Sequence, residues 1–120
     1  MTSSTEIAEQ YFVAWTSGDF ETARTLLRDD VAFSGPIDRF DNADDLIDSL
    51  RAFVQIVTGA ERCGLVGQGD EVCAIYDLST DAVESSPVAE WYLIRDGRIA
   101  SLEVFFDARP FVPRSEQRSA

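Results

Sequence analysis

The chain has 120 residues, 45% of them hydrophobic and 11% aromatic, which is the size of one domain and enough for an apolar core. Its net charge of -12 repels nucleic acid and anionic membranes and excludes both as expected partners. Histidine is absent, which excludes Ser-His-Asp and Cys-His catalysis and removes the commonest transition-metal ligand.

The first 27 residues have the spacing of two helices. Apolar residues between positions 5 and 15 recur at helical intervals, and Tyr11 and Trp15 lie on the face that they form. A hydroxyl residue at positions 3 to 5 can cap this helix, and Gly18 ends it. Asp19 then caps a second predicted helix. Its inner face carries Phe20, Ala23, Leu26 and Leu27.

A short strand and a loop follow. Arg28-Asp29-Asp30 is predicted to close the second helix, and Val31-Ala32-Phe33 to begin a strand. Gly35-Pro36 breaks that strand, since neither residue suits a strand interior, and opens a loop through Phe40.

Apolar residues from 46 to 57 predict a third helix, capped by Asp41 or Asn42 and ended by Thr58-Gly59. The apolar period then changes from 3.6 to 2, which indicates strands. Asp96-Gly97 between two apolar runs is the strongest short-range hairpin signal. The predicted strands run from Glu61 to Val66, Glu71 to Leu78, Pro87 to Arg95 and Arg98 to Phe106.

Three helices followed by four antiparallel strands predict a single α+β domain over residues 1–120, with a frayed polar tail at 113–120. The N-terminus has neither a basic region nor an apolar stretch, so we expect no signal peptide and a cytoplasmic location. Cys63 and Cys73 are too few for a disulfide framework or a Cys-only zinc site. They lie on strands expected to pair, and we expect reduced, buried thiols.

Two segments carry a resemblance to a known superfamily. They are "YFVAWTSGDFETARTLLRDDVAFSGP" (Tyr11 to Pro36) and "DGRIASLEVFFD" (Asp96 to Asp107). With this order of elements, the chain resembles the nuclear transport factor 2-like superfamily, which includes ketosteroid isomerases, limonene-epoxide hydrolases and SnoaL-like polyketide cyclases. The resemblance implies a cone-shaped α+β barrel, with three N-terminal helices on a strongly curved, mainly antiparallel sheet. It also implies a pocket between them and a homodimer through the outer sheet face.

The resemblance to ketosteroid isomerases suggests three candidate catalytic residues. Their general-base Asp corresponds to Gly35 here, and Asp38 in the same loop could substitute for it or be a solvated loop residue. Tyr11 matches their oxyanion-donor Tyr, and it could equally be a core Tyr with a partnered hydroxyl. Glu90 falls near the position of their second oxyanion donor, an Asp that stays protonated because its apolar surroundings raise its pKa.

Glu90 alternates in phase with Tyr92, so both face the pocket in one register of the strand. Burial would raise the pKa of Glu90 and suit it to act as general acid, general base or ligand hydrogen-bonding group. The alternatives are an ion pair with an interior Arg or a register in which Glu90 faces water. In the Asp-Arg-Asp set of limonene-epoxide hydrolases, Val88 and Val104 would replace two members, which argues against that activity.

The candidate ligand-binding residues are aromatic or apolar and suit a small, flat, apolar or aromatic molecule, although each also suits an ordinary core. They are Trp15, Phe33, Phe53, Tyr76, Tyr92, Leu102, Val104 and Phe106. The opposite sheet face is too apolar for water, which favours an interface. It carries Cys73, Ile75, Trp91, Leu93 and Phe105.

Three functions remain open from the sequence. The first is a SnoaL-like protein that binds a small molecule in its pocket. If it is an enzyme, it is a cofactor-free isomerase or cyclase in which Glu90 transfers a proton and Tyr11 stabilises an oxyanion. The second is a binding or scaffold module without turnover, favoured by Gly35 in place of the base. The third is a dimer with a filled core, which an empty cavity would rule out. We expect no cofactor and no metal in any of them.

Overall fold

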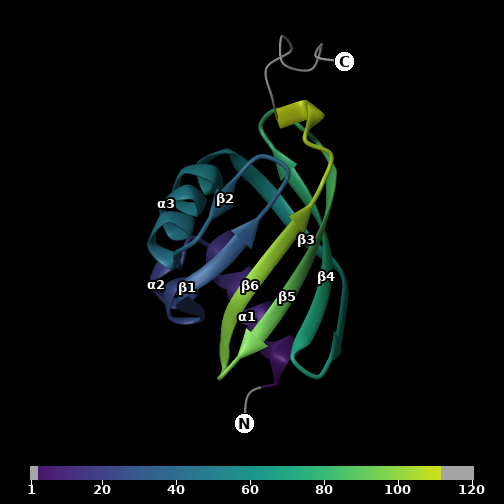
Figure 1. Cartoon of the computed structure of the whole chain (residues 1–120). Coiled ribbons are helices and arrows are strands. Elements are labelled where there is room, and N and C mark those ends of the chain that lie inside the picture. The colour runs from purple at the N-terminus through teal and green to yellow at the C-terminus, as the bar shows by residue number, and fades with distance from the viewer. Residues whose placement is uncertain (1–2, 112–120) are drawn as a thin grey trace.

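The computed structural model describes residues 3–111, which form a helical layer on one curved sheet (Figure 1). The tail predicted at 113–120 lies outside these residues. The helices are α1 (Ser4–Thr16), α2 (Phe20–Thr25), α3 (Ala43–Phe53) and the short 3-10 helices η1 (Val54–Ile56) and η2 (Arg109–Phe111). The strands are β1 (Leu27–Ser34), β2 (Arg39–Phe40), β3 (Val57–Gln68), β4 (Glu71–Thr80), β5 (Ser86–Arg95) and β6 (Arg98–Phe105).

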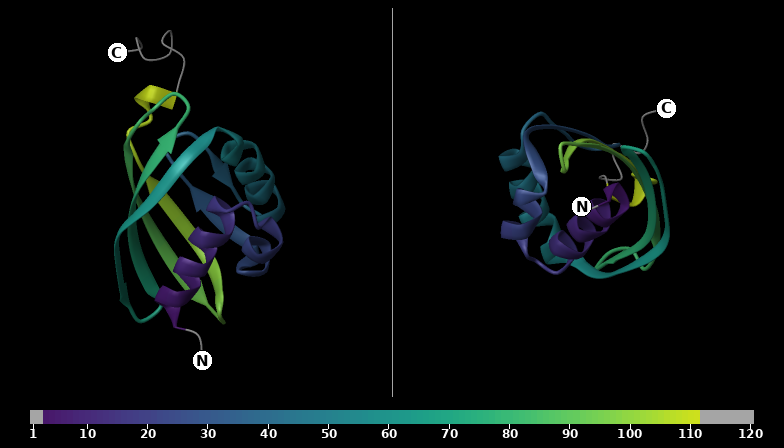
Figure 2. Two further views of the ribbon diagram at one scale, coloured as in Figure 1. Left: turned by 180° about the vertical axis from the view of Figure 1, so that it is seen from behind. Right: turned by 90° about the horizontal axis from the view of Figure 1, so that it is seen from below.

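The six strands form one sheet in the order β2-β1-β6-β5-β4-β3. All neighbours are antiparallel except β1 and β6, which are parallel. Seen from below, the sheet curls around α1, and α2 and α3 lie beside it near β1 (Figure 2). The predicted α+β class, with three helices on a strongly curved, mainly antiparallel sheet, is confirmed. The edge strands β2 and β3 do not pair with each other, so the sheet is open.

Local sequence explains the helix starts and the last hairpin. The side chains of Ser3, Asp19 and Asn42 cap the three α-helices by accepting hydrogen bonds from the backbone N–H three residues on. Asp96 and Gly97 both have positive φ, 54° and 77°, in the turn between β5 and β6. The predicted caps and hairpin turn are therefore confirmed.

Three predicted boundaries are wrong. Arg28-Asp29-Asp30 belongs to β1 and does not close α2, because β1 begins where Leu27 pairs with Ile99 of β6. The loop through Phe40 contains the two-residue strand β2, which pairs with the end of β1. Thr58-Gly59 does not end α3, because the helix stops at Phe53, tightens into η1, and β3 already begins at Val57.

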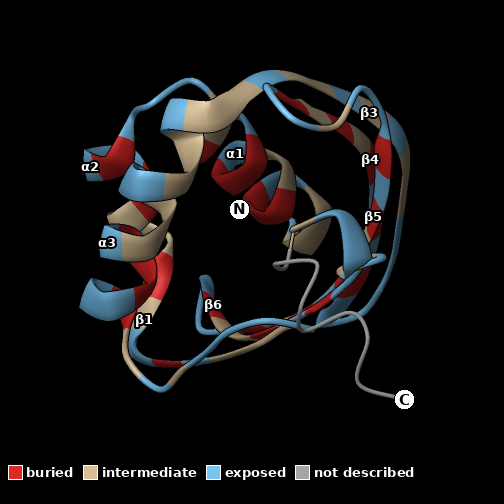
Figure 3. Cartoon of the chain, turned by 90° about the horizontal axis from the view of Figure 1, so that it is seen from above, coloured by how far each residue is buried: buried red, intermediate tan, exposed pale blue. Residues whose placement is uncertain are grey.

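The core lies between the helices and the concave face of the sheet. Alternate residues of β4 and β5 are buried, as the predicted strand period requires (Figure 3). The intervening residues face outward, and they include Cys73 on β4. Cys63 and Cys73 are free and exposed, so the expectation of buried thiols is wrong. Among residues 3–111, no helix has the length and apolar character needed to cross a bilayer.

Candidate functional site

A cavity of about 280 Å³ lies between the helices and the concave face of the sheet. Its walls come from α1, α3, the first two strands and the middle of the sheet, and most of the side chains in them are apolar or aromatic. The cavity opens where its lining is exposed, at Ile37 (45% exposed) and Asp38 in the loop between β1 and β2. Phe106 and Phe111, whose rings meet edge to face, line it beyond the end of β6.

One carboxyl group, that of Glu90, lies inside this apolar cavity, and it is 4% exposed. The Tyr92 hydroxyl donates a hydrogen bond to its Oε1, and the Tyr76 hydroxyl donates one to its Oε2 at 3.2 Å. Tyr92 is two residues along β5 and therefore on the same face, while Tyr76 comes from the adjacent strand β4, where it pairs with Val88. The sheet therefore holds both oxygens of the carboxyl in place.

Burial raises the pKa of Glu90 from 4.5 to about 7, because desolvation penalises the charged carboxylate. The hydrogen bonds from Tyr92 and Tyr76 and the charge of Arg62 lower the pKa and offset part of this effect. Both protonation states of Glu90 are consequently populated near neutral pH, as a general acid or base requires. Burial also raises the pKa values of Tyr11, Tyr76 and Tyr92 well above 10, so their hydroxyls stay protonated as donors.

Arg62 of β3 lies behind this group, outside the cavity lining. Its guanidinium stacks over the Phe12 ring at 4.1 Å and lies 5.9 Å from the centre of the Tyr76 ring. Its Nε donates to Glu9 Oε1 at 2.8 Å. Arg62 is therefore not the direct ion-pair partner of Glu90 that the sequence left open, and it acts on Glu90 only through its charge.

The structure brings most of the predicted site residues together. Tyr11, 1% exposed, lines the cavity, and its ring meets that of Tyr92 edge-on at 6.0 Å. Asp38 lies at the exposed opening, where its backbone carbonyl accepts from the Gly35 N–H at 2.9 Å. The predicted ligand-binding residues that line the cavity are Trp15, Phe33, Phe53, Tyr76, Val104 and Phe106.

Two predicted ligand-binding residues, Tyr92 and Leu102, do not line the cavity. Both are fully buried and pair with each other across β5 and β6, so they belong to the core beneath it. Conversely, the prediction did not include several residues that line the cavity. Leu46, Ser49 and Leu50 of α3 are among them. The helical spacing of the two leucines could have indicated that they lie on the inner face of this helix. Nothing in the sequence signals Phe111.

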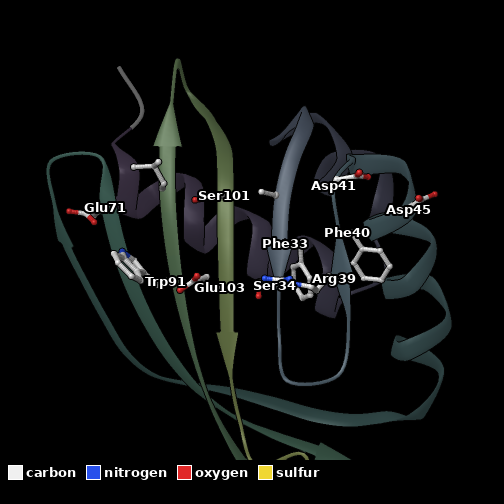
Figure 4. Close-up of a pocket in the computed structure, with 12 residues that line it drawn as sticks. Phe33, Ser34, Arg39, Phe40, Asp41, Asp45, Glu71, Trp91, Ser101 and Glu103 are labelled. Atoms are coloured by element: carbon white, nitrogen blue, oxygen red, sulfur yellow. The ribbon is translucent and has the colours of Figure 1, made fainter.

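A second hollow, open and about 730 Å³ in volume, lies on the outer face of the sheet (Figure 4). Trp91 of β5 and Glu103 of β6 lie side by side there, and Ser34 and Arg39 line it from β1 and β2 (Figure 4). Its lining mixes charges of both signs and encloses no buried carboxyl. The enclosed inner cavity is therefore the better candidate for chemistry.

Comparisons with known proteins agree with this fold. The family model of the SnoaL-like domain matches residues 8–102. A crystal structure of a protein from Kribbella flavida DSM 17836 is 32% identical, with 92% of both chains covered and a TM-score of 0.87. An NTF2-like protein of unknown function from Cytophaga hutchinsonii is 20% identical (92% of this chain and 96% of that one, TM-score 0.80). An LEH-like epoxide hydrolase from M. tuberculosis is 20% identical (88% and 83%, TM-score 0.75). Among curated proteins, none matches significantly.

Proposed function

The chain belongs to the SnoaL-like domain family, within the nuclear transport factor 2-like superfamily that its sequence resembles, and we propose that it binds a small apolar or aromatic molecule in its inner cavity. The observation that carries the proposal is the buried Glu90 carboxyl, held by two tyrosine hydroxyls in a mainly apolar cavity. Burying a carboxyl group in apolar surroundings destabilises the folded protein, so a purely structural core role does not explain the presence of Glu90.

The chemistry that best fits this group is cofactor-independent proton transfer, as in an isomerase or a cyclase. In its ionised form, Glu90 accepts a proton from the carbon next to a ligand carbonyl. The electron pair moves onto the carbonyl oxygen, and the neutral Tyr11 hydroxyl donates a hydrogen bond to the developing oxyanion. Where the ligand has a carbon–carbon double bond conjugated with this enolate, the electron pair returns from the oxyanion, the carbonyl re-forms, and Glu90 gives the proton to the far carbon of the conjugated system. This completes an isomerisation without any cofactor.

Asp38 has a smaller part in this proposal. It lies at the opening, exposed, and no hydrogen bond within residues 3–111 joins its carboxylate to Glu90. We propose that it meets the polar end of a ligand that enters there. The position of the isomerase base is Gly35, which favours the second candidate function, ligand binding without turnover.

We further propose that two copies of the chain associate through the outer face of the sheet. Large apolar side chains are exposed on four neighbouring strands there, which is typical of an interface. They are Val66 (71% exposed), Ile75 (44%), Trp91 (49%) and Phe105 (53%). An interface on this face leaves the opening of the inner cavity free, because the cavity lies on the other side of the sheet.

Thermal-shift screening tests the binding proposal. The wild type, Glu90→Gln and Glu61→Gln are screened against aromatic polyketides, steroids, terpenoids and small organic acids. Glu61 is exposed on β3 and does not line the cavity, so its variant controls for the loss of one carboxylate outside it. We expect at least one compound to raise the melting temperature of the wild type and of Glu61→Gln, and to raise that of Glu90→Gln less.

That compound then supplies the scaffold for turnover assays by NMR in deuterated buffer. Exchange of a ligand proton for deuterium, lost in Glu90→Gln, would support proton transfer. Binding without exchange or product would support the non-catalytic alternative. If no compound shifts any of the three proteins, the proposal that the cavity binds such molecules is wrong.

A further inference from the structure

One residue of the cavity wall carries a hydrogen-bond donor that has no partner in the described part of the chain. Trp15 lines the cavity and is 2% exposed, and its indole Nε1–H is buried without an acceptor among residues 3–111. Buried N–H groups are nearly always paired in folded proteins, because water can no longer solvate them. An unpaired donor on a residue that lines a cavity is therefore a group whose acceptor a bound molecule can supply.

Three aromatic rings hold the indole in position. The rings of Phe53, Phe12 and Tyr76 lie at centre-to-centre distances of 6.2, 6.4 and 6.4 Å from it. This packing limits the rotation of the Trp15 side chain, and the two Phe rings have no lone pair to offer the N–H. The donor is thus fixed before any ligand arrives, which lowers the entropic cost of binding an acceptor.

Trp15 also lies close to the polar group already described. Its ring contacts Tyr76, whose hydroxyl is bound to Glu90. Tyr11 precedes Trp15 by four residues and is thus on the same face of α1. Two residues of α1 that line the cavity therefore carry neutral donors, and Glu90 of β5 lines the same cavity with a carboxyl group.

We propose that the Trp15 indole Nε1–H donates a hydrogen bond to a carbonyl oxygen of the ligand, and that it selects compact aromatic ketones over hydrocarbons of the same shape. The proposal rests on the proposed function, because it takes the cavity to be a ligand site. The volume, equal to about nine liquid water molecules, fits a molecule of one or two rings. Arg62, whose Nη1 also has no acceptor within residues 3–111, does not line the cavity.

Two probes that differ in one acceptor test this proposal. 2-Acetylnaphthalene carries a carbonyl, and 2-isopropenylnaphthalene has nearly the same shape with a CH₂ group in place of the oxygen. Both are titrated into protein labelled with ¹⁵N at tryptophan. The two tryptophans give two indole signals, and the Trp91→Phe variant identifies the one from the exposed outer face.

We expect both probes to bind, the ketone about tenfold more tightly, because it alone satisfies the buried donor. The ketone should move the Trp15 indole proton downfield and leave the Trp91 signal unchanged. In Trp15→Phe, which lacks the donor and keeps an aromatic ring, the preference for the ketone over the hydrocarbon should be clearly smaller than in the wild type.

Equal affinity of the two probes for the wild type, without a downfield shift of the Trp15 proton, overturns this proposal. It leaves the proposed function standing, because both probes then occupy the cavity. Failure of both probes to bind rejects the proposed function for this ligand class, and the role of Trp15 with it. The shift in the wild type decides the matter even where Trp15→Phe does not fold.

Discussion

Replacing Glu90 with Gln should stabilise the protein above pH 7 and change its stability little near pH 4.5. The pKa of Glu90 rises from 4.5 in an ordinary carboxyl to about 7 in the folded protein. Between these values the folded state keeps a proton that the unfolded state has lost, so stability falls as the pH rises. Gln cannot ionise, and it has nearly the shape of a protonated Glu.

The expected magnitude follows from that pKa. A carboxyl whose pKa rises from 4.5 to about 7 on folding destabilises the protein by about 3 kcal/mol once it is ionised in both states. For a chain of this length, that corresponds to a difference in melting temperature of about 10 °C. The whole difference should develop between pH 4.5 and about pH 8.

The assay is urea unfolding of the wild type, Glu90→Gln and Glu61→Gln at pH 4.5, 6, 7 and 8. The difference in unfolding free energy between the wild type and each variant cancels the titration of the other acidic residues. Glu61→Gln shows what the loss of an exposed carboxylate does by itself. A difference for Glu90→Gln that stays constant from pH 4.5 to 8, or that favours the wild type as the pH rises, would refute the reasoning.

Two further predictions concern the hydroxyl donors and the outer face. Tyr92→Phe and Tyr76→Phe should each raise the pKa of Glu90 further, and Tyr92→Phe should raise it more, because the hydrogen bond from Tyr92 lowers that pKa more than the one from Tyr76. Titration followed by carboxyl ¹³C NMR measures the pKa of Glu90 in both variants. Unchanged pKa values would contradict the role of these donors. Phe105→Glu should convert the proposed dimer to a monomer in sedimentation, because it places a charge within the interface. Val13→Glu, at an exposed apolar position on α1, is its control, and a wild type that is already monomeric contradicts the interface.

Features decided by neighbouring residues could be predicted from the sequence. The helix caps, the apolar face of α1 with Tyr11 and Trp15, and the Asp96-Gly97 turn each depend on a few consecutive residues. The facing of Glu90 followed from alternation along β5, because a strand that buries one set of residues must expose the other. These features were sufficient to predict the fold class and the wall that contains Glu90.

Features that depend on distant pairings could not be predicted. β1 starts at Leu27 because it pairs with β6, more than seventy residues later, so Arg28-Asp29-Asp30 resembles a helix end only locally. The hydrogen bond from Tyr76 to Glu90 depends on the register of β4 against β5. The Trp15 N–H is unpaired because none of the described elements packed around it places a hydrogen-bond acceptor within reach, and residue spacing in the sequence does not indicate this.

The strand order separates the fixed part of the cavity from a replaceable part. β5 lies between β4 and β6, so the backbone that positions Glu90 is hydrogen-bonded on both sides. The opening, by contrast, lies at Ile37 and Asp38 in a loop, and Phe111, beyond the last strand, also lines the cavity. Substitutions at this rim can change which molecules enter without disturbing the carboxyl. A library randomised at these three positions would therefore explore new ligands while the acid–base group stays as it is.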